Sequence, residues 1–348
     1  MHQEIVTTDG SAFHFRDFQL AELGTTSVRM RVTFAAPKHG TEMHSVTGSA
    51  FADKRWDAEL RMFLPRDPAA LQPAPAERAM GNMVVGVVEA AGAGASKFKL
   101  GERVFGYGPI RDLHQADEAQ LYSADGLSDI NAVSVDPAHV AFVAVRDGNI
   151  RIGDSVAVYG LGAIGLMAVQ IARAGGARRV FAIDPIAIRR DFAKAHGADE
   201  VFDPTACDAA LEIKRATAKK GVDVSIETSG NSRALHDAIR CIRQCGNIVH
   251  VPWGPKDCSH LHLDQEFHLN RPTLIASQAW SGWGCADRSY PLWDHERAYQ
   301  AAIELLRSGL ITGEGLIHPI VSFADAPGAL LDVFKQPHKT IKLGVRLS

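Results

Sequence analysis

The chain has 348 residues, of which 46% are apolar and 22% charged, with a formal net charge of −3 and a pI near 6.6. This length suits two domains, each able to bury its own core, and the composition is typical of a globular protein. The small net charge excludes a general electrostatic attraction to nucleic acid or to an anionic membrane surface.

The N-terminal stretch "MHQEIVTTDG" lacks the basic and apolar regions of a secretory signal, and we expect a cytoplasmic protein. The longest uncharged run, 155–172, has the length of a membrane span, but glycines interrupt it and it starts like a strand. An odd number of cysteines without framework spacing favours reduced thiols. These cysteines are Cys207, Cys241, Cys245, Cys258 and Cys285.

The first 145 residues predict a small β-rich domain. Residues 28–35 alternate apolar and polar side chains, and 83–92 and 101–108 are short apolar runs with glycines at their ends, so each predicts a strand. Residues 51–80 are charged and then rich in Pro and Ala, which predicts a loop-dominated insertion.

From residue 150 onward, predicted strands and helices alternate at the spacing of a parallel sheet with crossover helices. A further helix is predicted over 297–311 and a closing strand over 339–345. The predicted strands of the sheet are 154–160, 178–184, 200–204, 222–230, 247–253 and 272–280, and the predicted helices are 163–177, 186–198 and 231–246.

The stretch "VAVYGLGAIG" places Gly160, Gly162 and Gly165 directly after a predicted strand and at the start of a helix. In a dinucleotide site the first glycine makes the tight turn, the second lets the backbone approach a pyrophosphate, and the third lets helix and strand pack closely. The intervening Ala163 and Ile164 lie in the first helical turn, where N–H groups face the phosphates.

Asp184 lies 19 residues beyond Gly165, at the end of the next predicted strand. Its carboxylate can accept hydrogen bonds from both hydroxyls of a ribose and would repel a 2′-phosphate, which favours NAD over NADP. Arg189 and Arg190 follow closely and would soften this preference.

In this context the chain resembles the medium-chain dehydrogenase/reductase family. The resemblance rests on "GVVEAAGAGASKFKLGERV", "IRIGDSVAVYGLGAIGLMAVQIARAGGARRVFAID", "VDVSIETSGNSRALHDAIRCIRQCGNIVHV" and "LIHPIVSFADAPGALLDVFKQPHKTIKLGV". It implies an α/β fold, with a Rossmann doubly wound parallel sheet over 148–285 and a GroES-like β-rich catalytic domain over 1–147 and 286–348. It also implies an active site between the domains and a homodimer or homotetramer.

The same resemblance extends the expected cofactor site beyond the glycine turn. Val251 to Trp253, Ser277 and Gln278 match positions that flank the nicotinamide in the family, and Ser229 belongs to the same site. The predicted strand that contains "TLIASQ" matches the strand by which family members join two Rossmann sheets in a dimer.

The expected metal positions depart from the zinc members of the family. His39-Gly40-Thr41-Glu42 replaces Cys-Gly-Ser/Thr-Asp, Gly81-Asn82-Met83 replaces Gly-His-Glu, and Asp136 aligns with the third ligand. No cysteine precedes residue 207, so the four-cysteine structural lobe is absent. Because amide and thioether groups are poor zinc ligands, we expect no metal, although His114 and His139 are further imidazoles in this region.

Without zinc, a side chain must take the hydroxyl proton of the alcohol. Our first candidate is His44, since a histidine at this place relays protons in many zinc members and imidazole titrates near neutral pH. His39 replaces a zinc ligand and is expected to face the reacting centre, with Glu42 and Asp136 as orienting partners. The alternative is that "KHGTEMH" is only a polar turn.

Three further residues are candidates for the substrate site: Trp56, Asn82 and Trp280. Trp56 belongs to the insertion, where the alternative is a solvated loop. Cys241 and Cys245, one helical turn apart in the predicted helix 231–246, are expected to pack in the core rather than to bind metal.

These features favour a zinc-independent, NAD-dependent oxidoreductase that acts on a secondary alcohol or its ketone, with a polyol, sugar or cyclitol as the substrate. One alternative is an NADPH-dependent quinone or enoyl reductase of the same family, against which Asp184 argues. Another is a nucleotide-binding sensor or structural protein that has lost its chemistry.

Overall fold

The structure is a computed structural model that describes residues 1–38, 40, 42, 51, 53–67, 77–254, 257–279 and 293–347. The chain divides into two compact units, Met1–Ser134 with Gly313–Ser348 and Val135–Thr312. The second unit is longer at both ends than the expected Rossmann domain. Its terminal helices, α3 (Val135–Asp147) and α9 (His295–Arg307), pack against each other, and α3 also packs on α4 (Ala163–Ala174) of the same unit.

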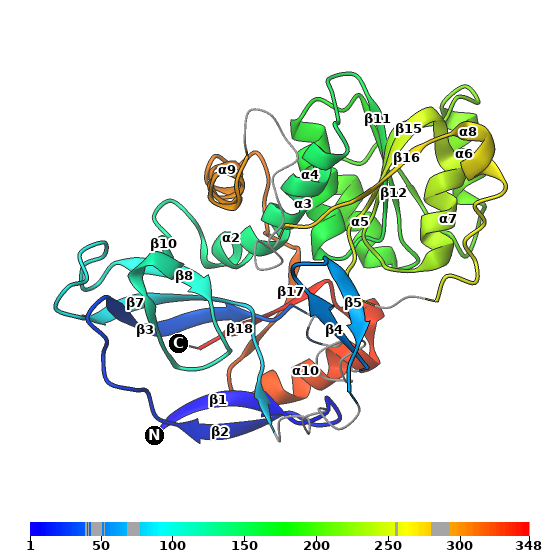
Figure 1. Ribbon diagram of the computed structural model, residues 1–348. Coiled ribbons are helices and arrows are strands. Elements are labelled where there is room, and N and C mark those ends of the chain that lie inside the picture. Colours follow the sequence, from blue (N-terminus) through cyan, green and yellow to red (C-terminus); the bar gives the residue numbers. More distant parts are fainter. Residues whose placement is uncertain are drawn as a thin grey trace. The chain divides into compact units, whose positions relative to one another are not determined.

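The first unit is built on sheets whose strands pair antiparallel, except that β17 and β18 pair parallel (Figure 1). Among its described strands, seven form a sheet of order β10-β8-β7-β3-β18-β17 with β9 paired to β3, and three form a sheet of order β2-β1-β6. Their bounds are β1 His2–Thr7, β2 His14–Phe18, β3 Ser27–Ala36, β6 Arg78–Ala79, β7 Met83–Ala91, β8 Arg103–Tyr107, β9 Leu113–Asp117, β10 Leu121–Ser123, β17 Ile317–Ser322 and β18 Lys342–Arg346. The unit also contains helices α2 (Asp129–Val133) and α10 (Ala326–Lys335) and the 3₁₀ turns η2 (Glu118–Gln120) and η4 (Pro337–Lys339).

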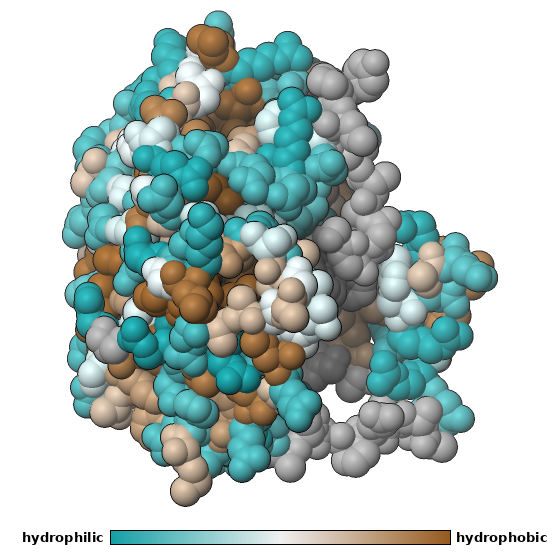
Figure 2. Space-filling view, turned by 90° about the vertical axis from the view of Figure 1, so that its left-hand side faces the viewer, coloured by the Kyte–Doolittle hydropathy of each residue, from teal (hydrophilic) through white to brown (hydrophobic). Residues whose placement is uncertain are grey.

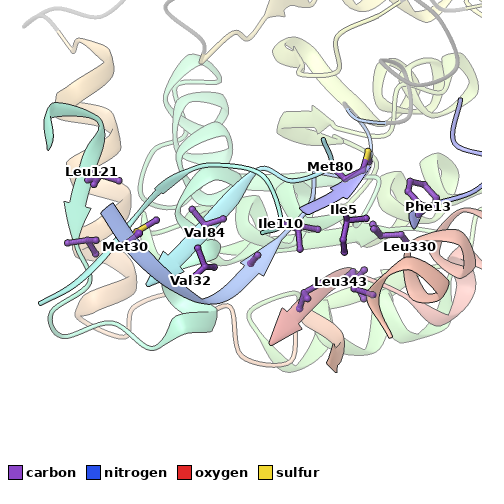
Figure 3. Close-up of a cluster of buried hydrophobic side chains, with 14 of the residues drawn as sticks. Ile5, Phe13, Met30, Val32, Met80, Val84, Ile110, Leu121, Leu330 and Leu343 are labelled. Atoms are coloured by element: carbon purple, nitrogen blue, oxygen red, sulfur yellow. The ribbon is translucent and has the colours of Figure 1, made fainter. Parts of the chain in front are cut away.

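A hydrophobic cluster joins the strands of this unit to helix α10. Figure 3 shows side chains from both ends of the chain gathered in it, among them Ile5, Val32, Val84, Leu330 and Leu343. The first part of strand β3 contributes alternate residues, Val28, Met30 and Val32, because successive side chains of a strand point to opposite faces of the sheet. The C-terminal segment therefore completes the core of the N-terminal unit.

The second unit is a doubly wound parallel sheet. Its six described strands are ordered β13-β12-β11-β14-β15-β16, and all neighbours are parallel. Every residue of β11 is buried, as expected for a strand covered on both faces. The bounds are β11 Ser155–Tyr159, β12 Arg179–Ile183, β13 Glu200–Phe202, β14 Val222–Glu227, β15 Ile242–His250 and β16 Thr273–Ala276.

Helices cover both faces of this sheet, with α3, α4 and α5 in one layer and α6, α7 and α8 in the other (Figure 1). Each of α6 and α7 begins at a side chain that accepts a hydrogen bond from the first turn, Asp208 and Asn231 respectively. The bounds are α4 Ala163–Ala174, α5 Ala187–Ala195, α6 Ala209–Ala216, α7 Ser232–Cys241 and α8 Glu266–Asn270.

One predicted helix is shorter than expected. The prediction of a helix over 231–246 is wrong beyond Cys241, because strand β15 starts at the next residue and pairs with β14. Cys241 is buried in the core, whereas Cys245 is exposed and has φ +57°, so the expected packing of both thiols on one helix is wrong for Cys245. Tertiary pairing of β15 outweighs the local helical pattern here.

The insertion contains a β-hairpin in addition to loops. Strands β4 (Lys54–Asp57) and β5 (Met62–Pro65) pair only with each other among the described strands. The Trp56 and Phe63 rings meet edge to face at 5.3 Å, and the Phe51 ring stacks on Phe63 at 4.7 Å. Because a lone two-stranded hairpin is marginal in water, these aromatic contacts account for its order.

Hydrophilic and apolar residues are intermixed over the face shown in Figure 2. Isolated apolar residues such as Leu100 and Ile152 are exposed, which is ordinary for a folded chain. Within the described ranges, no helix has both the length and the apolar character needed to cross a bilayer.

Candidate functional site

The turn between β11 and α4 has the geometry of a phosphate cradle. Gly160 has φ +83°, and a Cβ atom added to Gly165 would lie 1.9 Å from the Gly160 carbonyl oxygen. A Cβ on Gly162 would meet nothing within 4 Å, so the backbone is open to a ligand there. Helix α4 starts after Gly162, and the N–H groups of Ala163 and Ile164 in its first turn have no partner within the helix.

Asp184, directly after β12, is tied to this turn. One of its carboxylate oxygens accepts the Leu161 N–H at 2.7 Å and the other accepts the Ile186 N–H at 2.8 Å. Arg189 Nη1 lies 3.7 Å from the first oxygen. Since each carboxylate oxygen can accept two hydrogen bonds, capacity remains for the hydroxyls of a ribose.

The neighbouring Arg190 is engaged in a different way. Its Nη1 donates to the Asp184 main-chain oxygen at 2.7 Å and lies 3.1 Å from an Asp203 carboxylate oxygen. Of the two arginines that the sequence places here, Arg189 is therefore the one beside the Asp184 side chain.

A second carboxylate, Glu227, lies at the end of β14 and is completely buried. Its Oε1 accepts the N–H groups of Ser229 and Gly230 at 2.6 and 2.9 Å and the Ser229 hydroxyl at 2.5 Å. Ser229 in turn abuts the glycine turn, because a Cβ on Gly160 would lie 2.7 Å from it. Glu227 Oε2 lies 3.0 Å from Nδ1 of His250, the last residue of β15.

The other predicted cofactor residues continue the same edge of the sheet. Val251 N–H donates to the Glu227 main-chain oxygen at 3.0 Å, and Ser277 N–H donates to that of His250 at 2.9 Å. Trp253 and Gln278 are exposed. The structure thus brings the cofactor candidates together along the carboxyl ends of the parallel strands, where open α/β sheets bind nucleotides.

In the first unit, Glu42 joins the two segments that flank the insertion. Its carboxylate accepts the N–H of Lys38 at 2.7 Å and that of Gly81 at 2.5 Å. Burial raises its pKa, while the two backbone N–H groups and the charge of Lys342 oppose this rise. Lys342 is buried and donates to the main-chain oxygen of Pro37, which braces the same segment from strand β18.

The remaining predicted residues are divided between the two units. The Asn82 N–H donates to the Ala36 main-chain oxygen at 3.3 Å, and the Asn82 main-chain oxygen accepts the Gly108 N–H at 3.0 Å. Trp56 is part of the hairpin. Asp136 is buried in the first turn of α3, in the second unit. The other three predicted side chains lie outside the described residues: His39, His44 and Trp280.

Comparisons with known proteins identify the chain. A family profile described as zinc-binding dehydrogenase matches residues 163–288. D-guloside 3-dehydrogenase of Escherichia coli K12 is 39% identical over 331 residues, which cover 91% of this chain and 92% of the relative. The chain belongs to the medium-chain dehydrogenase/reductase family. It is therefore an oxidoreductase, as its sequence predicts.

Two further comparisons agree with this family. Sorbitol dehydrogenase of Bacillus subtilis is 28% identical over 221 residues, which cover 64% of this chain and 58% of the relative. The crystal structure of 2R,3R-butanediol dehydrogenase from Bacillus subtilis superposes with a TM-score of 0.77 at 21% identity and covers 100% of both chains. The predicted Rossmann sheet with a GroES-like domain is thus confirmed as the fold of this family member.

This family member has unusual side chains at the metal positions. Met83 is buried at the start of β7, next to Asn82, and the family resemblance assigns both positions to the metal site of the zinc members. Over the described ranges, no three His, Cys, Asp or Glu side chains gather as metal ligands would. The donors present at 82 and 83, an amide and a thioether, fit zinc poorly.

His114 and His139 are buried histidines of different units. His139 packs against the His295 and Tyr299 rings at 4.8 and 5.3 Å. The Arg111 guanidinium donates to His114 Nδ1 at 2.6 Å, so that nitrogen carries no proton. Burial, reinforced by this cation, lowers the pKa of His114 to about 4.

The depressed pKa of His114 predicts that the first unit loses stability in acid. Between pH 6.5 and about 4 the unfolded chain binds a proton that the folded chain does not, so the free energy of unfolding falls as pH decreases. We expect a contribution of about 3 kcal/mol, fully present above pH 6.5 and lost as pH approaches 4. Denaturant titrations at several pH values measure it.

His114→Gln removes the titrating group and should flatten this part of the stability curve. The matched control is His2→Gln, because His2 is exposed and lies 3.1 Å from Asp112 in the same unit. An unchanged pH slope in His114→Gln would refute the assignment.

Sequence reasoning missed Glu227, His250 and Lys342. Glu227 and His250 are the polar last residues of two consecutive parallel strands. Because ligands bind at the carboxyl ends of such strands, polar residues at these positions in the sequence indicate a binding site. Lys342 had no such signal, since a lysine in a closing strand is usually exposed.

Proposed function

We propose that the protein is a zinc-independent, NAD-dependent dehydrogenase that oxidises a secondary hydroxyl of a sugar or polyol to a ketone. The main support is the position of the Asp184 carboxylate, which lies at the end of the second strand and is bonded to the glycine turn. A negative charge at this place accepts ribose hydroxyls and disfavours a 2′-phosphate.

The residues of the second unit fit a dinucleotide. The open space at Gly162 admits a pyrophosphate, and the N-terminus of α4 supplies N–H groups and a positive dipole end. The bound nicotinamide would supply the hydride acceptor. Arg189 lies 3.7 Å from the Asp184 carboxylate and partly offsets its negative charge. The preference for NAD over NADP should therefore be moderate rather than absolute.

We propose that His44 takes the proton of the substrate hydroxyl and that His39 faces the reacting centre. Glu42 supports a positioning role rather than that of a base, because both of its oxygens accept backbone N–H groups. These bonds hold Glu42, which lies between the two histidines in the sequence, to residues 38 and 81. Asp136 is proposed as an orienting carboxylate.

The names of the relatives and the hairpin support the proposed substrate class. D-guloside 3-dehydrogenase is named for a glycoside and sorbitol dehydrogenase for a polyol. Trp56 and Trp280 are proposed to form walls for such a substrate, with Asn82 as a hydrogen-bonding group. We further propose a cytoplasmic homodimer or homotetramer, for which the exposed Leu274 on edge strand β16 is supporting evidence.

The test is a substrate and cofactor panel. Purified enzyme is assayed at 340 nm with NAD⁺ or NADP⁺ against methyl gulosides, sorbitol, myo-inositol and 2,3-butanediol, and its metal content is measured. We expect turnover of a sugar or polyol with NAD⁺ in metal-free protein. Asp184→Asn should reduce the preference for NAD⁺ by about 10-fold, whereas Asp191→Asn, on the exposed face of α5, should not.

The other outcomes are distinct. Reduction of activated C=C bonds with NADPH alone would favour the quinone or enoyl reductase. Nucleotide binding without turnover of any alcohol or ketone would favour the sensor. One zinc per chain, with activity lost on chelation, would contradict the zinc-independent reaction.

A further inference from the structure

The contact between Glu227 and His250 leaves two buried polar atoms facing each other. Oε1 of Glu227 is occupied by the 229–230 turn, whereas Oε2 has no hydrogen bond within the described residues. The same is true of His250 Nδ1, which lies 3.0 Å away. A buried carboxylate oxygen requires a donor, and the imidazole is the group in place to provide one.

This contact determines which nitrogen of His250 is available to a ligand. With the proton on Nδ1, directed at Glu227, a neutral imidazole presents Nε2 as an acceptor. The His250 side chain is 21% exposed while its Nδ1 is buried, so the exposed part of the side chain excludes Nδ1. His250 is thus held by a carboxylate that also shapes the turn next to Gly160.

The strand order places His250 on the nicotinamide side of the sheet. In the order β13-β12-β11-β14-β15-β16, the adenine half of a dinucleotide lies over the β12 side, where Asp184 is, and the pyrophosphate lies over the turn after β11. The second half then extends over β14 and β15. Tyr159, Glu227, His250 and Ala276 form one row across this edge.

We infer that His250 binds the ribose attached to the nicotinamide, with Nε2 accepting a hydrogen bond from a ribose hydroxyl and Glu227 fixing the imidazole. The inference rests on the proposed function, because it needs a bound nicotinamide dinucleotide. His250 thereby becomes a further cofactor-binding residue, in addition to the glycine turn and Asp184. It also explains the buried carboxylate at 227, which orients a ligand group and the 229–230 turn at the same time.

Three ligands of increasing length test this assignment. ADP ends at the pyrophosphate, ADP-ribose adds the second ribose, and NADH adds the nicotinamide. For His250→Ala we expect the Kd of ADP to stay within about 2-fold and the Kd values of ADP-ribose and NADH to rise by about 3- to 10-fold, as for one lost hydrogen bond. His250→Gln, whose amide oxygen is an acceptor, should restore part of the loss.

Glu227→Gln provides a second variant, and its effect should also appear with ADP-ribose and NADH. Its single amide oxygen is needed by the 229–230 turn, so a donor NH2 group would face Nδ1 in place of the acceptor. His268→Gln, at an exposed position of α8, is the matched control and should leave all three Kd values unchanged. Thermal melting of each variant reports on folding, and unchanged ADP binding reports on the glycine turn.

Each outcome decides the question. Equal weakening of all three ligands by His250→Ala would show a purely structural role and overturn the inference, as would no weakening at all. If wild-type protein bound ADP-ribose no more tightly than ADP, no ribose contact would exist. If wild-type protein bound no NADH, the proposed function itself would fail, and this result is separate from any effect of the variants.

Discussion

Gly162→Ala is expected to fold like the wild-type protein and to bind NADH on the order of 100-fold more weakly. The added Cβ meets no protein atom within 4 Å, and Gly162 has φ −68°, which any residue adopts. The cost in stability should be about 1 kcal/mol or less, as for an N-cap glycine replaced by alanine. The methyl group would occupy the space that the backbone leaves for the pyrophosphate.

Gly165→Ala should show the opposite pattern. Its Cβ would lie 1.9 Å from the Gly160 carbonyl oxygen and 2.9 Å from the Thr228 hydroxyl oxygen, both fixed by the fold. We expect a loss of about 3 kcal/mol or more in the free energy of unfolding, since helix α4 must move away from the sheet. Gly328→Ala in helix α10, where a Cβ also meets nothing within 4 Å, is the control for adding a methyl group.

Fluorescence titration with NADH and denaturant unfolding measure the two effects separately. Wild-type NADH affinity in Gly162→Ala would show that the pyrophosphate does not approach this glycine. Wild-type stability in Gly165→Ala would contradict the close packing of helix and turn.

The largest expected effect on turnover is that of His44→Ala, for which kcat should fall by about 100- to 10,000-fold. Loss of the proposed general base would remove the path for the hydroxyl proton and leave the dinucleotide contacts of the second unit unchanged. The Kd of NADH should therefore stay within about 2-fold. Steady-state kinetics with the substrate found in the panel, together with NADH titration, measure both quantities.

The pH profile separates a base from a structural side chain. Alcohol oxidation by the wild-type enzyme should rise with pH as the base loses its proton, and His44→Ala should lose this dependence. His39→Ala is the partner variant, and His2→Ala, on the exposed face of β1, is the control. If His39→Ala lost the pH dependence and His44→Ala kept it, the roles of the two histidines would be exchanged. Full turnover in both variants would exclude both from the chemistry.

Much of the fold could be predicted because its signals are local. The apolar run over 155–159, the glycines after it and the apolar positions of α4 are neighbours in the chain, so their pattern predicts strand, turn and helix directly. The three glycines adopt the separate roles that their spacing predicts: a positive φ at Gly160, open space at Gly162 and close packing at Gly165.

The end of helix α7 at Cys241 and the hairpin over 54–65 were not predicted from the sequence, because both depend on pairing between segments. Strand β15 forms because β14 and β16 lie on either side of it, a context that the helical pattern of 231–246 does not contain. The hairpin is ordered by aromatic contacts among Phe51, Trp56 and Phe63. In both cases tertiary contacts outweigh local preference.

The sequence by itself therefore determined the family, the parallel sheet, the glycine turn and the acidic residue at position 184, since each is encoded by residue types at short, fixed spacing. Only the tertiary structure decided what buried polar groups do. It joined Glu42 to Gly81, Lys342 to Pro37 and Glu227 to His250, pairs that are far apart in the chain or on different strands. The physical reason is that a buried charge must find a partner in space, and the chain brings that partner close only when it folds.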